Sequence, residues 1–136
     1  MKRKLLFALG LFAAVLSNAL ALEIGDEPED KGTFLNLPDG GQLQLFVEEN
    51  KILAYFIDAE GLIMRPPAES ILFIIDDALS DKDTWRTVLS PSDAKMVGSR
   101  LLYPPYSFRT KVIVRFADKD PVSFFRTSVD LARNQK

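Results

Sequence analysis

The residues of this chain best suited to chemistry are the carboxylates that gather in one short stretch, Asp76, Asp77, Asp81 and Asp83. Two carboxylates could serve a hydrolase as acid and base, and three or four could bind calcium. Their spacing does not form the D-x-D-x-D-G calcium loop, and they follow an apolar run, as an exposed connection would. We interpret the stretch as a solvated loop, with a calcium site and a carboxylate-based hydrolase as alternatives.

Two residue types that dominate catalysis and metal binding are missing, because the chain has no histidine and no cysteine. Their absence excludes a Ser-His-Asp arrangement, a cysteine nucleophile, disulfides, and metal sites built on imidazole or thiolate. General acid–base chemistry would fall to Asp, Glu, Lys or Tyr, whose pKa values lie far from neutrality unless they are buried. We therefore expect a protein that is not an enzyme and carries no cofactor.

Basic side chains recur along one expected strand. Arg109, Lys111 and Arg115 share one side of the segment 108–116, and Arg126 lies across the expected hairpin. Such a face could attract an anionic ligand or a partner. The alternative is a solvent-facing ladder that keeps the sheet soluble.

An aromatic loop is the other candidate for partner contact. Tyr103, Pro104, Pro105 and Tyr106 form a stiff, extended segment with two rings. A stiff loop loses little conformational entropy on binding, so it could contact a protein at low cost. Alternatively, the loop only closes one end of the fold.

The framework that must position these residues has the pattern of strands. Alternating apolar and polar residues, separated by Gly, Pro and Asp turns, predict strands. The expected strands span residues 33–37, 42–48, 52–57, 62–65, 71–75, 84–89, 108–116 and 122–129. The expected fold is all-β, an antiparallel immunoglobulin-like β-sandwich of six to eight strands. Its expected core contains Leu43, Leu45, Val47, Phe73, Trp85, Val112, Val114 and Phe116.

One segment departs from this rhythm. Ser90 suits a helix N-cap, Pro91 the first helical position, and Gly98 the residue after a helix end. These signals predict one short helical turn near 91–97.

The N-terminus has the pattern of a cleavable signal peptide. A basic start at Lys2, an apolar run over 5–16 and an A-x-A site at 19–21 precede polar, acidic chain. We expect export to a bacterial periplasm or to the exterior, with no membrane span after cleavage. The predicted divisions are a signal peptide 1–21, a flexible acidic arm 22–32, a β-sandwich domain 33–130 and a polar tail 131–136.

Charge narrows the partners. The chain has 17 Lys and Arg against 19 Asp and Glu, and cleavage would remove three of the positive charges. An acidic chain without a run of basic residues is a poor match for nucleic acid or for anionic lipid.

The segment 40–76 resembles small bacterial periplasmic β-sandwich modules associated with heavy-metal efflux systems and their adaptor proteins. The similarity consists of the Gly40-Gly41 turn before a strand, followed by a hairpin with Tyr55, Asp58 and Gly61 at the matching positions. The resemblance implies a periplasmic sandwich and an association with metal efflux. Taken together, we expect an exported, non-catalytic binding or accessory module that contacts a cell-envelope protein, with a metal-efflux or calcium-binding module as the alternative.

Overall fold

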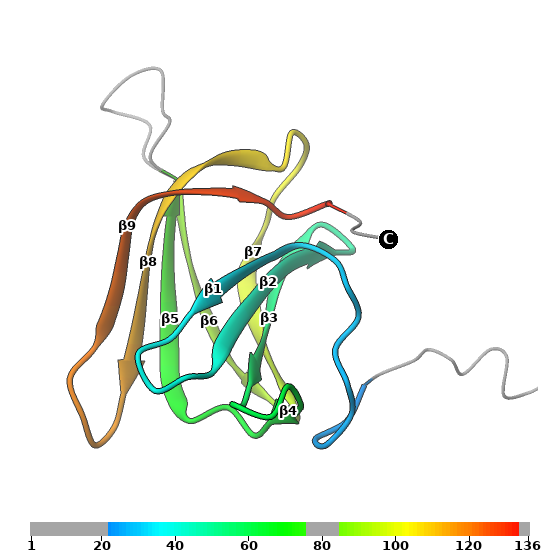
Figure 1. Cartoon of the computed structure of the whole chain (residues 1–136). Helices are drawn as coiled ribbons and strands as arrows, with labels where there is room; N and C mark the ends of the chain where they lie inside the picture. The colour runs from blue at the N-terminus through cyan, green and yellow to red at the C-terminus, as the bar shows by residue number, and fades with distance from the viewer. Residues whose placement is uncertain (1–21, 76–84, 134–136) are drawn as a thin grey trace, which may run out of the picture.

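Antiparallel strands make up the regular structure of this protein. The computed structural model describes residues 22–75 and 85–133, and within them the secondary structure is all-β (Figure 1). The strands are β1 (Thr33–Asn36), β2 (Gln42–Glu48), β3 (Lys51–Ile57), β4 (Ile63–Met64), β5 (Ala68–Ile75), β6 (Trp85–Ser92), β7 (Lys95–Leu101), β8 (Ser107–Phe116) and β9 (Val122–Asp130). The prediction of an all-β, antiparallel protein is confirmed.

All of these strands belong to one sheet that curls until its two edges nearly meet. Its order is β1-β2-β3-β7-β6-β5-β8-β9, with β4 paired to β3. The two edges meet at one end, where the Thr33 hydroxyl donates to the Asp130 carbonyl and accepts from the Asp130 N–H at 2.8 Å. The Gly32 N–H donates to the Arg133 carbonyl at 2.7 Å beside them. The result is a nearly closed sheet around one interior.

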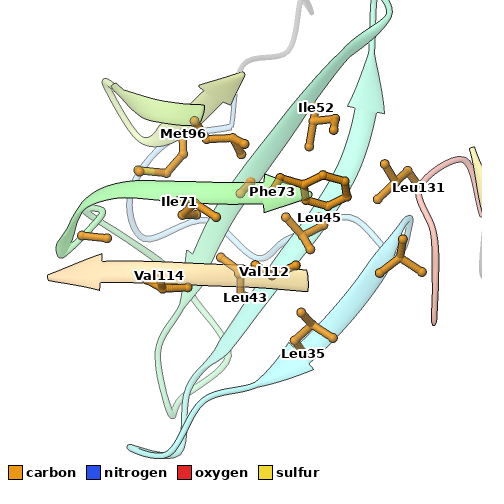
Figure 2. Close-up of a cluster of buried hydrophobic side chains, with 14 of the residues drawn as sticks. Leu35, Leu43, Leu45, Ile52, Ile71, Phe73, Met96, Val112, Val114 and Leu131 are labelled. Carbon is orange, nitrogen blue, oxygen red and sulfur yellow. The ribbon is translucent and has the colours of Figure 1, made fainter. Parts of the chain in front are cut away.

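The interior is filled from both halves of the sheet. Leu43, Leu45 and Ile52 come from β2 and β3, and they meet Phe73 and Val112 from β5 and β8 (Figure 2). All five are fully buried. The core is continuous because each strand alternates, with one face packed inward and the other outward.

The core residues predicted from the sequence all belong to this cluster, at two levels of burial. Leu43, Leu45, Phe73, Val112 and Val114 are buried members. The other three predicted core residues are only partly buried and pack against the cluster, namely Val47, Trp85 and Phe116.

The predicted helical turn near 91–97 is wrong. β6 continues to Ser92, and β7 pairs back onto it with Pro91 opposite Met96 and Ser92 opposite Lys95. Asp93 makes the reversal with a left-handed φ of 57°. Met96 is completely buried in the main core, and this burial favours a strand over a solvent-facing helical turn. The helix-start residues Ser90 and Pro91 also suit the end of a strand before a hairpin.

The segment 22–32, predicted to be a flexible acidic arm, lies against the outer side of β2 and β3. The Gln44 amide donates to the carbonyls of Glu29 and Lys31 at 2.8 and 3.0 Å. The Lys31 ammonium lies 4.4 Å from the centre of the Phe46 ring. These contacts bury a second apolar cluster outside the main core, comprising Phe46, Leu53, Tyr55, Ile63 and Ala94.

No helix long and apolar enough to cross a membrane occurs in residues 22–75 and 85–133. The predicted signal peptide and Asp76, Asp77, Asp81 and Asp83 lie outside the described residues, as does half of the predicted tail.

Candidate functional site

The outward side of four neighbouring strands combines apolar and basic side chains. In β5, Leu72 is paired on one side with Val88 of β6 and on the other with Ile113 of β8. Directly paired residues point to the same side of a sheet, so these three form one row across the strands. Their neighbours Ile71 and Phe73 point into the core. The row is therefore on the outer surface.

Basic residues border this row. Arg86 of β6 and Lys111 of β8 both pair with Ile74, two positions along β5 from Leu72. On the same strand, Arg109 precedes Lys111 by two residues and Arg115 follows Ile113 by two residues. Both arginines are exposed. The structure therefore places the predicted basic residues of β8 on one face.

A β-bulge adds Arg126 and a large aromatic ring to the same face. Thr110 pairs with Thr127 and Val112 with Phe124, so two residues of β9, Phe125 and Arg126, lie opposite Lys111 alone. Arg126 takes a left-handed φ of 53° to accommodate the extra residue. Phe125 is 63% exposed, the largest exposure among the large apolar residues that the structure describes.

We call this surface the basic-apolar face, defined by Leu72, Arg86, Val88, Arg109, Lys111, Ile113, Arg115, Phe125 and Arg126. The four strands β5, β6, β8 and β9 contain five basic residues and two carboxylates, Glu69 near the start of β5 and Asp130 at the end of β9. The whole chain nevertheless has more acidic than basic residues. Positive charge is therefore concentrated here on an otherwise acidic protein, and the surface is complementary to an acidic one.

Phe125 was not among the predicted site residues. The sequence carries a signal for it, because the dipeptide Phe124-Phe125 breaks the alternation of the strand and one ring must point outward. The bulge was not predictable from this pattern, since it depends on the register between β8 and β9.

The predicted Tyr-Pro-Pro-Tyr loop lies between β7 and β8, and its two rings have different surroundings. Tyr103 is 60% exposed. Tyr106 packs against the main core, and its hydroxyl donates to Asn50 Oδ1 at 2.6 Å. Pro104 and Pro105 are exposed and joined by a cis peptide bond. One ring of this loop is thus available to a partner, while the other anchors the loop to the β2–β3 turn.

The part of the chain that the structure describes offers no cluster of metal-binding side chains. Among those residues, no group of three or more His, Cys, Asp or Glu side chains could hold a metal ion.

Burial, and next the charge of Glu48, raise the pKa of Tyr55 above its ordinary value of 10.0. Tyr55 lies under the segment 22–32, stacked on Phe46 with ring centres 5.6 Å apart, and this packing points to a structural role.

Comparisons of the chain with protein-family models, with curated proteins and with solved structures found no match.

Proposed function

We propose that this chain is an exported, non-catalytic binding module that docks onto an acidic surface of a cell-envelope protein through its basic-apolar face. The observation that carries the proposal is the combination of Phe125, Ile113 and Leu72 with basic neighbours, which outnumber the carboxylates of the same four strands five to two. Protein interfaces typically have an apolar, aromatic centre and a polar rim, and arginine is enriched in them.

Electrostatics favour a protein over a nucleic acid or a membrane as the partner. The chain as a whole is acidic, and long-range repulsion from a polyanion would oppose the attraction of one basic face. An acidic patch on a protein requires only local complementarity. The envelope location follows from the predicted signal peptide at 1–21 and from the expected cleavage before Leu22.

The non-enzymatic character is part of the same proposal. It is supported by the lack of histidine and cysteine in the whole sequence. The alternatives, a metal-efflux or calcium-binding module and a carboxylate-based hydrolase, depend on the resemblance of 40–76 or on Asp76, Asp77, Asp81 and Asp83, and the basic-apolar face supports neither. The Tyr103–Tyr106 loop is a second candidate contact, supported by the exposed ring of Tyr103.

We also propose a finer fold class for this sheet, a flattened barrel. An immunoglobulin-like sandwich would set β1, β2 and β3 against β5, β8 and β9 as two layers about the shared core. The continuous pairing from β3 through β7 to β6 favours a flattened barrel instead. The basic-apolar face has the same residues in either description.

Affinity capture with surface variants tests the proposed function. The protein recovered from its producing cells is immobilised and exposed to envelope extract, in parallel with the double variant Ile113→Ser/Phe125→Ser and with Tyr103→Ala. We expect the double variant to lose the captured protein and Tyr103→Ala to retain it. If only Tyr103→Ala loses the captured protein, the Tyr103–Tyr106 loop makes the contact. Unchanged capture by both variants would show that neither surface makes it.

A further inference from the structure

A pocket opens at one end of the curled sheet, away from the point where β1 and β9 meet. Three turns surround it, those that follow β1, β3 and β8, and all of them lie at the lower end of the molecule in Figure 1. Its walls are mainly apolar. The larger apolar side chains that line it are Leu37, Phe56, Ile57, Met64, Phe116 and Val122. Because Phe56 belongs to the main core, the floor of the pocket borders that core.

The size of the pocket limits what it can hold. Its volume is about 300 Å³. A dry apolar cavity of roughly 150 Å³ binds benzene, so twice that volume suits a ligand of about ten to twelve non-hydrogen atoms. Apolar walls of this kind favour a small organic molecule over an ion or a folded partner.

The rim of the pocket carries an excess of negative charge. Asp39 and Asp58 line it, opposed by the single ammonium of Lys119. Each carboxylate holds its own turn through Oδ1, since Asp39 accepts from the Gly41 N–H and Asp58 accepts from the N–H groups of Glu60 and Leu62. These hydrogen bonds hold each carboxylate at the rim of the pocket, and its other oxygen can attract a cation.

Lys119 does not reverse this balance. Its Nζ lies 4.4 Å from the centre of the Phe116 ring, so the ammonium already interacts with one wall of the pocket. Its neighbours in the β8–β9 turn, Asp118 and Asp120, are exposed carboxylates that add negative charge on both sides of it. An anionic ligand would be repelled overall, whereas a cationic ligand would be attracted.

We propose that this pocket binds a small organic cation whose apolar tail fills the space between β3, β4 and the β8–β9 turn while its cationic head lies beside Asp39 and Asp58. The site is separate from the basic-apolar face, which is formed by the outward side of the sheet. It would give the module a ligand of its own, independent of the proposed docking.

Titration with n-decylamine, which as an ammonium ion has about eleven non-hydrogen atoms, tests the proposal. Binding to the protein recovered from its producing cells is followed by calorimetry and by backbone amide NMR, below the concentration at which the amine forms micelles. We expect saturable binding to one site, shifts centred on Phe56, Met64 and Val122, and binding at least about tenfold tighter than that of decanoate. Decanoate binding as tightly as the amine would overturn the proposal.

Variants locate the ligand. Val122→Phe fills the pocket and should abolish binding, whereas Ser123→Phe, with the same ring on the opposite side of β9, should leave binding unchanged. Asp39→Asn/Asp58→Asn keeps the oxygen that holds each turn and should weaken binding about fivefold to tenfold. Glu49→Gln/Asp130→Asn removes the same charge at the other end of the strands and should have little effect.

Lys119→Gln keeps the proposal testable if Val122→Phe does not fold. Removal of this exposed ammonium should tighten binding of the amine and weaken any binding of decanoate. Weaker binding of the amine by Lys119→Gln, or undiminished binding by a folded Val122→Phe, would contradict the proposed site.

Discussion

Tyr103 and Tyr106 flank the same two prolines and have different surroundings. The Tyr106 ring packs on the main core and its hydroxyl donates to Asn50 Oδ1 at 2.6 Å. The Tyr103 ring is mostly exposed. The loop is thus fixed on one side and accessible on the other, because only one of its aromatic rings can reach the β2–β3 turn.

We expect Tyr106→Phe to lower the free energy of unfolding by about 1 kcal/mol, since it removes one hydrogen bond and leaves the ring in place. Tyr103→Phe is the matched control and should leave the stability unchanged. Urea denaturation of both variants measures the difference. Equal stability of the two would show that the bond to Asn50 contributes nothing net.

Tyr55 makes the stability depend on pH in the alkaline range. Burial, followed by the charge of Glu48, raises its pKa above 10.0 in the folded protein. Above that pH the unfolded chain loses the phenolic proton while the folded protein keeps it, so the folded state becomes less stable as the pH rises through the folded pKa. Tyr55 makes its full contribution to the stability of the folded state below pH 10.0.

We expect Tyr55→Phe to reduce the loss of stability between neutral pH and strongly alkaline pH. Urea denaturation at a series of pH values measures it, with Tyr103→Phe as the control that keeps the Tyr55 hydroxyl. An unchanged pH profile in Tyr55→Phe would contradict the assignment.

At the scale of elements, the closure of the sheet depends on a glycine. Gly32 has a φ of 72°, and its N–H donates to the Arg133 carbonyl across the junction of the two edges. An added Cβ would overlap the Leu45 carbonyl oxygen. Both features make this position intolerant of a side chain.

We expect Gly32→Ala to lower the free energy of unfolding by about 3 kcal/mol or more. Gly25→Ala is the control, because Gly25 also has a positive φ but an added Cβ there would meet nothing within 4 Å. That variant should lose only about 1 kcal/mol. Equal losses measured by denaturation would show that closure at Gly32 is not tightly packed.

At the bulge in β9, the effect of backbone strain at Arg126 can be measured separately from the effect of its charge. Arg126 holds a left-handed φ that glycine adopts freely. We expect Arg126→Gly to raise the free energy of unfolding by about 1 kcal/mol and at the same time to weaken partner binding. Arg126→Gln should weaken binding to a similar extent without the gain in stability. A less stable Arg126→Gly would contradict the assignment of strain.

The elements also show where sequence patterns are informative. Strands whose sequences alternate, such as β2 and β8, were predictable because one face of each packs into the main core, although the outer face of β2 is also buried at Gln44 and Phe46. β7 was not, because the apolar Val97 lies between the buried Met96 and Gly98 and weakens the alternation, so the helix-start signals at Ser90 and Pro91 outweighed it. The register of a strand follows from its partners, so the β9 bulge and the exposure of Phe125 could not be derived from local pattern alone.

At the scale of the whole molecule, the predicted basic residues lie together, but the site that includes them is larger than the prediction. Arg109, Lys111 and Arg115 share a face because they alternate along one strand. Leu72 and Val88 join them only through the pairing of β5 with its two neighbours, which the sequence does not encode locally. The end pocket was also missed, since its walls come from turns far apart in the chain.

Site-specific photo-crosslinking in intact cells tests whether the basic-apolar face contacts an acidic envelope protein. A photoreactive phenylalanine analogue is placed at Phe125, and in a second strain at Phe34 of β1, outside that face. We expect one envelope protein to crosslink from position 125 only, and the crosslink to be lost when Lys111→Glu and Arg115→Glu reverse the charge of the face. Crosslinking of the same protein from both positions, or a crosslink unaffected by charge reversal, would contradict the proposed contact.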